Sequence, residues 1–420
     1  MKPRMKALYF NPTLPRAILS KTLSLFSKDA YWIKGSPLIY GEAPIPELPG
    51  QDWIRIKCRL TGICGSDMAA ITLKGSLDNP IKHFLSFPMF LGHEIVGEID
   101  SLGKAVKDLT TAERVAVYPL LSCAPRGISP PCPNCQKGEL GLCQNLAEGN
   151  LPPGQCIGMN SRTGGGFSEY LVAHRSQVFR IPDSVPDEHA VLLDPLGVAL
   201  HSVLLAQILP SNKVLVIGAG IIGLCVIQMI RALDIDCEVY VVARHDFQKE
   251  LAVQCGANRI IEDTEDATKS VLLAEDLQAK QYASRFVKPF FMGGFDRTFD
   301  CVGTAETLQR SICWSNHRGR VILVGASPSK RFEWSLLYWK EVQLIGSISF
   351  GMETVQGKRR HAIEIVLEML EEKRLRLDLL SVQTFRLADY RVALKSLLGK
   401  SQAQTVKIAF DFRDQASSKG

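Results

Sequence analysis

No apolar run in this 420-residue sequence approaches the length of about 18 residues that a helix needs to cross a bilayer. No dense block of Lys and Arg is present either, and the net charge of +6 is spread thinly along the chain. No internal repeat is found. The sequence therefore argues against membrane-spanning, nucleic-acid-binding and repeat proteins, and we expect neither a membrane nor a nucleic acid as a partner.

The first 28 residues contain Lys, Arg and Ser but no acidic residue, which is the composition of a transit peptide. The segment Met5–Phe10 nevertheless has the pattern of a first strand that belongs to the fold. No secretory signal is found, and 46% apolar with 22% charged residues is ordinary for a soluble globular protein. We therefore expect a cytoplasmic protein.

The length of the chain predicts two domains, because a single core seldom grows to this size. The first third is rich in strands, and Trp53–Leu60 alternates with the two-residue period of a half-buried strand. From about residue 195 strands and helices alternate, which predicts an α/β domain with a parallel sheet. In residues 348–420 helical and strand patterns are mixed again.

Four of the twelve cysteines crowd one Pro- and Gly-rich stretch. Without a secretory signal, such spacing favours a metal site over a disulfide framework. Thiolates in a closed tetrahedral site stabilise a short loop that has no core of its own, so a structural zinc ion is expected. A set of oxidisable thiols without metal is the alternative. The four residues are Cys123, Cys132, Cys135 and Cys143.

A glycine motif follows the apolar strand Val214–Ile217 and opens a helix, which is the context of a dinucleotide-binding turn. Gly218 permits the tight turn, Gly220 lets the pyrophosphate approach the backbone, and Gly223 allows close helix–strand packing. The helix N-terminus offers N–H groups to the phosphates. A glycine-rich turn without a ligand is the alternative. The motif is Gly218, Ala219, Gly220, Ile221, Ile222 and Gly223.

The end of the next strand decides the choice of cofactor. An NAD site usually places an acid there, about twenty residues beyond the last glycine, to bind the ribose hydroxyls. This strand ends in Ala243, Arg244 and His245, and the first acid is Asp246. A small residue followed by Arg accommodates a 2′-phosphate, so NADP is favoured. The alternative is an NAD enzyme in which Arg244 stacks on the adenine.

The motifs together resemble the zinc-containing alcohol dehydrogenase branch of the medium-chain dehydrogenase/reductase family over nearly the whole chain. The matching segments are Gly62–Asp67, Gly92–Glu94, the four cysteines, Gly165–Tyr170 and Val214–Gly223. The resemblance implies a mainly-β GroES-like catalytic domain, residues 1–194 and 348–420, and a Rossmann domain with a doubly wound parallel sheet, residues 195–347. We also place Val302 and Gly325 in the cofactor site and expect a homo-oligomer, a dimer or a tetramer.

The resemblance also implies a catalytic zinc ion with Cys64 and His93 as its first two ligands. The third ligand of the family falls just before the Rossmann domain, where Asp194 precedes Pro195 as in the sorbitol and threonine dehydrogenase branches. Glu94 is the competing ligand, and Asp194 as a helix N-cap is the other interpretation of that residue. Asp67 is expected to hold His93 in position.

The second zinc site departs from the family spacing C-x2-C-x2-C-x7-C. Ser129 stands where the first cysteine belongs, and Cys123 replaces it through a longer loop. A further departure is Ala69, which occupies the place of a proton-relay His five residues after Cys64. The stretch Lys74–Phe87 is longer than usual and borders the region expected to set specificity.

The resulting hypothesis is a reversible hydride transfer between NADP and an alcohol or polyol, or the matching aldehyde or ketone. Ser66 occupies the place where the family has a hydroxyl that carries the alcohol proton outward. Two alternatives stay open, a zinc-free reductase of enones or quinones and a non-catalytic protein that senses NADP. The charged stretch Glu262–Gln281 is predicted to be one irregular helix plus a loop, without a function.

Overall fold

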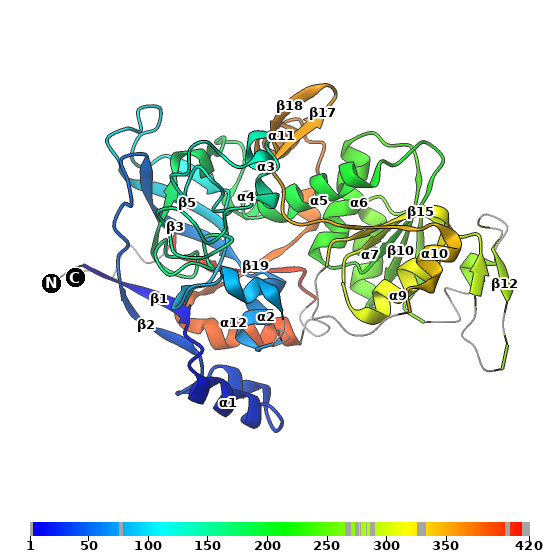
Figure 1. Ribbon diagram of the computed structural model, residues 1–420, viewed down its shortest axis with the longest axis horizontal. Helices are drawn as coiled ribbons and strands as arrows, with labels where there is room; N and C mark the ends of the chain where they lie inside the picture. The colour runs from blue at the N-terminus through cyan, green and yellow to red at the C-terminus, as the bar shows by residue number, and fades with distance from the viewer. Residues whose placement is uncertain are drawn as a thin grey trace. The chain divides into compact units, whose positions relative to one another are not determined.

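The computed structural model describes residues 3–74, 79–264, 270–273, 277, 279–282, 284–285, 290–325, 333–399 and 404–413 (Figure 1). Backbone contacts divide the chain into two compact units. Unit 1 comprises residues 1–194, 354–367 and 381–420, and unit 2 comprises residues 195–353 and 368–380. None of the described helices combines the length and the apolar character needed to cross a membrane.

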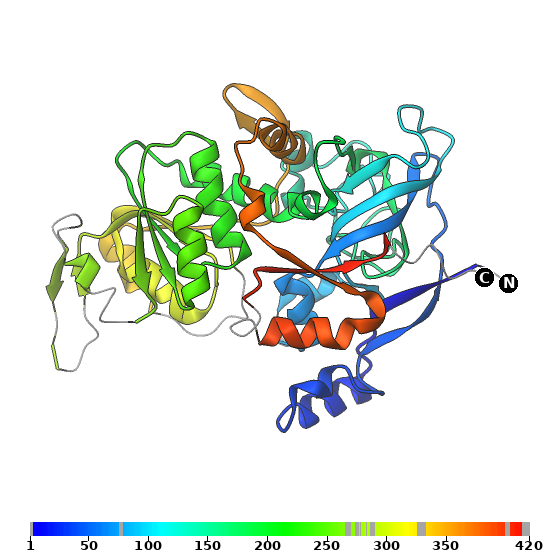
Figure 2. The same cartoon turned by 180° about the vertical axis from the view of Figure 1, so that it is seen from behind.

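Unit 1 is built on a seven-stranded sheet that is mostly antiparallel. Its central strand β3 (Trp53–Gly62) buries alternate apolar side chains, as its sequence predicts. The C-terminal strand β20 pairs with β3, which brings the end of the chain beside its first third (Figure 2). The strands in order are β19 (Val382–Arg386), β20 (Lys407–Asp411), β3, β5 (Glu94–Leu102), β6 (Arg114–Val117) and β8 (Val178–Arg180), with β7 (Tyr170–His174) on β3.

A second, three-stranded sheet contains β1 (Arg4–Phe10), which is the strand expected at Met5–Phe10. β1 pairs with β2 (Leu38–Pro44) and with β4 (Met89–Phe90). The connection from β1 to β2 contains the helix α1 (Leu14–Leu23), which the sequence analysis did not predict. The other helices of unit 1 are α2 (Gly65–Ile71), α3 (Pro133–Gln136), α4 (Asp187–Ala190) and α12 (Tyr390–Leu398).

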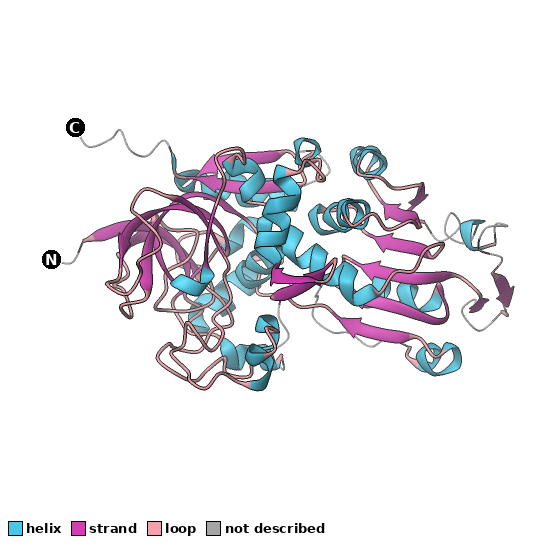
Figure 3. Cartoon of the chain, turned by 90° about the horizontal axis from the view of Figure 1, so that it is seen from above, coloured by secondary structure: helices cyan, strands magenta, loops and turns pink. Residues whose placement is uncertain are grey.

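Unit 2 is a six-stranded parallel sheet with helices on both faces (Figure 3). The first strand of the unit, β9, lies in the middle of the sheet. The next strands in sequence are added on one side of it and the later ones on the other side, as in a Rossmann fold. The strands in order are β11 (Arg259–Glu262), β10 (Glu238–Ala243), β9 (Lys213–Ile217), β14 (Phe295–Asp300), β15 (Ser315–Leu323) and β16 (Gln343–Gly346). Its helices are α6 (Ile221–Ala232), α7 (Asp246–Gln254), α9 (Ala305–Cys313) and α10 (Ser335–Lys340).

Two helices contain a boundary between the units, α5 (Leu193–Ala206) and α11 (Ala362–Glu371). The strands β17 (Met352–Val355) and β18 (Lys358–His361) form a separate hairpin. The predicted helix at Glu262–Gln281 falls partly on residues 265–269, 274–276 and 278, which lie outside the described residues. Its end is a strand instead, because Lys280–Tyr282 (β12) pairs with Phe290–Met292 (β13).

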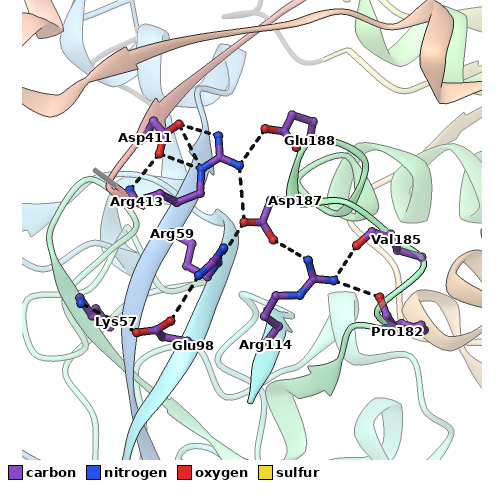
Figure 4. A network of polar contacts seen from close by, with 10 residues as sticks. All are labelled: Lys57, Arg59, Glu98, Arg114, Pro182, Val185, Asp187, Glu188, Asp411 and Arg413. Carbon is purple, nitrogen blue, oxygen red and sulfur yellow. Dashed lines mark hydrogen bonds and ion pairs between the residues drawn. The ribbon is translucent and has the colours of Figure 1, made fainter. Parts of the chain in front are cut away.

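A buried carboxylate ties the C-terminus of unit 1 to its central sheet (Figure 4). The side chain of Asp187 is 1% exposed and lies beside three guanidinium groups. Its oxygens are 2.9 Å from Arg59 Nε, 3.2 Å from Arg114 Nη1 and 3.6 Å from Arg413 Nη1. Arg114 also donates to the carbonyls of Pro182 and Val185, so the network spans β3, β6, α4 and the segment after β20.

Asp187→Asn is expected to destabilise unit 1 by about 3 kcal/mol, because it leaves three clustered guanidinium groups without their shared anion. Urea unfolding followed by tryptophan fluorescence measures the change. The control is Asp52→Asn, which removes a 55% exposed carboxylate from its contact with His174 and should cost less than about 1 kcal/mol. Equal midpoints for the two variants would contradict this role of Asp187.

Candidate active site

The carboxylate of Asp67 holds two motif segments together. It accepts hydrogen bonds from the backbone N–H of Cys64 at 2.9 Å and of Gly92 at 3.1 Å. The first bond caps helix α2, whose N-cap is Cys64. Burial would raise the pKa of Asp67, but the charge of His93 and these donors lower it. The two hydrogen bonds that the Asp67 side chain accepts from the backbone therefore fix Cys64 and His93 beside each other.

His93 lies in the buried part of this cluster. Its Nε2 is 3.4 Å from Ser66 Oγ, and its Nδ1 is 3.6 Å from Asp67 Oδ1, an ion-pair distance that is too long for a hydrogen bond. Burial would lower the pKa of His93, but the negative charges of Asp67 and Cys64 raise it well above its usual value. Asp67 thus lies beside His93, as expected, and interacts with it through charge rather than through a hydrogen bond.

Glu94 has a partner that the sequence analysis missed. Its carboxylate forms an ion pair with Lys407, and both side chains are at most 3% exposed. Lys407 Nζ also donates to the carbonyl of Ile63 at 3.3 Å. A Cβ atom at Gly62 would collide with the Glu94 carboxylate, so glycine is required where β3 passes this pair. Glu94 is thus neutralised by a lysine from the far end of the sequence.

Asp194 lies in the first turn of α5, inside the helix rather than at its N-cap. The pKa of Asp194 is raised to about 7, chiefly by burial and also by the charge of Glu94, against the opposing effects of His93 and Lys407. Its carboxyl group therefore belongs to the same buried electrostatic cluster as His93 and Glu94.

The donor chemistry of this cluster fits a zinc ion, because a thiol, an imidazole and a carboxylate are the ligand types of catalytic zinc sites. A cation among these groups would favour the ionised form of Asp194, which burial alone opposes. The ligand atoms of this cluster lie farther apart than those of a closed site. Among the residues that the structure describes, only the four clustered cysteines form a group of three or more potential ligands whose ligand atoms all lie within 4.8 Å of one another.

That four-cysteine group, the cysteine lobe, includes Cys123 and not Ser129, which is exposed. The Sγ atoms of Cys123 and Cys143 are 3.7 Å apart. N–H groups point at the sulfurs, as in the bond from Asn145 Nδ2 to Cys123 at 3.3 Å and from Gln144 N to Cys132 at 3.5 Å. Burial would raise the pKa of Cys132, but the backbone N–H groups of Gln144 and Cys135 and the thiols of Cys135 and Cys123 lower it to about 6. The lobe can hold a tetrahedral zinc ion.

A buried arginine organises the loop around the lobe. Arg126 is 0% exposed and donates hydrogen bonds only to backbone carbonyls. Burial lowers the pKa of Arg126, whereas the charges of Cys143 and Cys123 act in the opposite direction. The sequence showed no signal for this role beyond an arginine within a Pro- and Gly-rich stretch. The acceptors are Leu121, Leu146, Glu148, Leu151, Pro152 and Gly154.

In unit 2 the glycine motif lies where the sequence predicts, between β9 and α6, with Gly220 as the N-cap of the helix. Gly218 has φ +97°, and a Cβ there would lie 2.6 Å from Val302 Cγ2. Nothing lies within 4 Å of a Cβ placed on Gly220, so the turn is open above it. A Cβ on Gly325 would lie 2.6 Å from the Val302 backbone, so these residues meet at the carboxyl ends of β9, β14 and β15. This edge is where a Rossmann sheet binds its dinucleotide.

The end of β10 shows Ala243 buried and Arg244 exposed to 74%. Arg244 Nη2 lies 2.9 Å from Asp263 Oδ2, and Arg310 Nη1 lies 2.7 Å from Asp263 Oδ1. Burial would raise the pKa of Asp263, but the two arginines lower it. The acid missing at the end of β10 is thus found after β11, where it holds Arg244 by an ion pair. His245 caps α7 and its ring stacks on Phe247.

The comparisons with known proteins agree with both units. Residues 50–183 match the family model of the alcohol dehydrogenase GroES-like domain, and residues 222–370 match that of the zinc-binding dehydrogenase. L-threonine 3-dehydrogenase of Anaeromyxobacter sp. (strain Fw109-5) is 30% identical over 306 residues, which cover 73% of this chain and 78% of that protein. The chain belongs to the zinc-containing alcohol dehydrogenase branch of the medium-chain dehydrogenase/reductase family. It is an NAD(P)-dependent dehydrogenase.

Two further matches are to proteins named as galactitol 1-phosphate dehydrogenases. Galactitol 1-phosphate 5-dehydrogenase of Escherichia coli (strain K12) is 37% identical over 211 residues, 48% of this chain and 54% of that protein. The crystal structure of galactitol-1-phosphate dehydrogenase from Escherichia coli superposes with a TM-score of 0.69 at 25% identity, covering 97% of this chain and all of that one. The predicted GroES-like and Rossmann fold is thereby confirmed.

Proposed function

We propose that this dehydrogenase oxidises a secondary alcohol or polyol, or reduces the matching ketone, with NADP as its preferred cofactor. The observation that carries the proposal is the buried cluster in unit 1, in which Asp67 accepts from the backbone of Cys64 and Gly92 and Ser66 Oγ lies 3.4 Å from His93 Nε2. Threonine and galactitol 1-phosphate, which name two of the relatives, both carry secondary hydroxyl groups.

Cys64, His93 and Asp194 are the residues that would hold the catalytic zinc ion. A zinc ion there would supply a Lewis acid that polarises the substrate oxygen. Glu94 is the weaker candidate for the third ligand, because its carboxylate is already paired with Lys407 in the protein interior.

Ser66 has the position to hold the proton that leaves the alcohol. Its Oγ lies 3.4 Å from Nε2 of the proposed ligand His93. Ala69 offers no titratable group beyond Ser66, so water would take the proton from the Ser66 hydroxyl. The cysteine lobe stabilises the fold and takes no part in the chemistry.

In unit 2 the N–H groups at the start of α6 would bind the pyrophosphate, and Gly220 would leave room for it. Val302 lies against Gly218 and Gly325, and Val302 and Gly325 would border the bound cofactor. Arg244 offers charge-assisted hydrogen bonds to a 2′-phosphate, and Ala243 leaves the space that an acid would occupy. Arg244, Arg310 and Asp263 together carry a net positive charge, which favours the additional phosphate of NADP.

The reaction class is tested by metal analysis of the purified protein, followed by a screen of secondary alcohols, polyols and ketones with both cofactors. We expect cofactor reduction that depends on the alcohol and stops when the metal is chelated. Turnover of enones or quinones without zinc would contradict the proposal.

The cofactor preference is a separate prediction. With any accepted substrate, kcat/KM should be higher with NADP than with NAD by about tenfold, the effect of one charge-assisted contact worth about 1.4 kcal/mol. Ala243→Asp combined with Arg244→Ile should reverse the order, because an acceptor for the ribose hydroxyls replaces the phosphate anchor. Asp263→Asn should increase the NADP preference, because it frees Arg244 from its carboxylate.

The control is Arg318→Gln, which removes an equally exposed arginine of unit 2 from its ion pair with Glu341 and should leave the ratio unchanged. A wild-type enzyme that prefers NAD would refute the assignment. It would leave Arg244 as a residue that packs on the adenine.

A further inference from the structure

The helix α1 exposes most of its large apolar side chains, and its one buried residue is the polar Ser20. Leu14, Ile18 and Leu19 are exposed to 73%, 56% and 40%, whereas Ser20 is 0% exposed. Nη1 of Arg16 is also buried. Helices on the surface of a soluble protein normally show the opposite arrangement.

The apolar surface continues beyond the helix. Leu25 and Phe26, in the turn that follows α1, are exposed to 82% and 86%. We call the whole surface the α1 patch. It consists of Leu14, Pro15, Ile18, Leu19, Leu23, Leu25 and Phe26.

The patch lies in a connection that is much longer than joining β1 to β2 requires. β1 and β2 are paired along their whole length, and a two-residue turn could connect them, yet 27 residues separate Phe10 from Leu38. α1 lies at the end of this hairpin (Figures 1 and 2). Its connection back to β2 is anchored, because Tyr31 and Trp32 are buried in the main core of unit 1. The patch is therefore presented by a folded element.

The charged side chains of the connection from β1 to β2 are basic, with one exception. Lys21, Lys28 and Lys34 are exposed on this connection. Its only acid, Asp29, lies 2.9 Å from Lys395 and is neutralised by it. Two copies of the chain that met through this surface would bring these lysines together without a counter-charge. A surface of anionic lipid headgroups complements both the lysines and the exposed leucine and phenylalanine side chains.

We propose that the α1 patch docks the protein onto an anionic lipid surface, with Leu14, Ile18, Leu25 and Phe26 inserted at the headgroup boundary and the lysines on the phosphates. This inference is independent of the proposed function. It differs from the expectation of no membrane partner, which rested on the lack of a run long enough to span a bilayer and did not consider binding at the surface.

The test is flotation of the full-length protein with vesicles of phosphatidylcholine containing 30% phosphatidylglycerol, compared with vesicles of phosphatidylcholine alone. We expect binding to the anionic vesicles, at least tenfold weaker binding to the neutral ones, and release in high salt. Leu25→Ser with Phe26→Ser should reduce the binding at least tenfold. Lys21→Gln and Lys28→Gln should each reduce it by about fivefold, the factor that corresponds to about 1 kcal/mol per lysine near the surface.

Matched controls are Leu209→Ser and Lys104→Gln, which alter an exposed leucine and an exposed lysine elsewhere and should change nothing. Unaltered dehydrogenase activity shows that each variant is folded. Absence of flotation, equal binding to neutral vesicles, or equal binding by the Leu25→Ser, Phe26→Ser variant would overturn the proposal. If the wild type instead forms a dimer that this variant loses in sedimentation equilibrium, a second copy covers the patch and the lipid proposal is wrong.

Discussion

Cys64→Ser is expected to lower kcat/KM by about a thousandfold or more and to remove about one of two zinc ions per chain. The thiol stands at the N-cap of α2 beside His93. A Lewis acid contributes several kcal/mol to stabilising the charge on the reacting oxygen, and each ~1.4 kcal/mol corresponds to a tenfold change in rate. Steady-state kinetics and elemental analysis of the same preparation provide the two readouts.

The fold of this variant should persist, because the bond from the backbone N–H of residue 64 to Asp67 does not involve the sulfur. Cys237→Ser is the matched control, since it changes a buried thiol of unit 2 and should retain zinc and activity. An active Cys64→Ser protein that lacks the metal would refute the role of Cys64 as a ligand. Asp194→Asn and Glu94→Gln can then be compared for metal content, and we expect the larger loss from Asp194→Asn.

Cys123→Ser is expected to cause the largest loss of stability. It removes one of the four sulfurs that lie within 4.8 Å of one another in a loop with little apolar core. The free energy of zinc binding at a four-ligand structural site is on the order of 10 kcal/mol, so weakening it should cost several kcal/mol. Thermal unfolding should shift down by on the order of 10 °C, and the purified variant should carry about one zinc ion less.

Ser129→Ala is the control for this experiment, because Ser129 is exposed and stands where the family spacing would place the first cysteine. It should leave zinc content and thermal stability unchanged. The assignment of Cys123 fails if Cys123→Ser keeps its full zinc content, and it fails more clearly if Ser129→Ala loses a zinc ion.

The sequence by itself determined the features that depend on short stretches of backbone. The glycines after Val214–Ile217 predict the turn, the start of α6 and the Rossmann fold, because a positive φ and close packing at Gly218 and Gly223 tolerate no side chain. The spacing of the lobe cysteines is equally local, and the longer loop from Cys123 to Cys132 still brings the four sulfurs together.

The tertiary structure alone decided which partner each charged side chain has. Lys407 reaches Glu94 because β20 pairs with β3 next to β5, and nothing near Glu94 in sequence announces that lysine. A charged residue within the apolar run of β20 was the one available signal. Arg244 meets Asp263 in the same way, because β10 and β11 are adjacent strands.

The helix α1 shows that the sequence alone also does not determine which side chains of a surface helix are exposed. Its sequence alternates leucine and isoleucine with basic residues, a pattern that also fits a transit peptide or a buried helix. Only the folded chain shows that Ser20 faces inward and Leu14 outward. Backbone motifs are determined by neighbours in sequence, whereas burial and charge pairing are determined by segments that meet only when the sheets form, which is why only the tertiary structure could decide them.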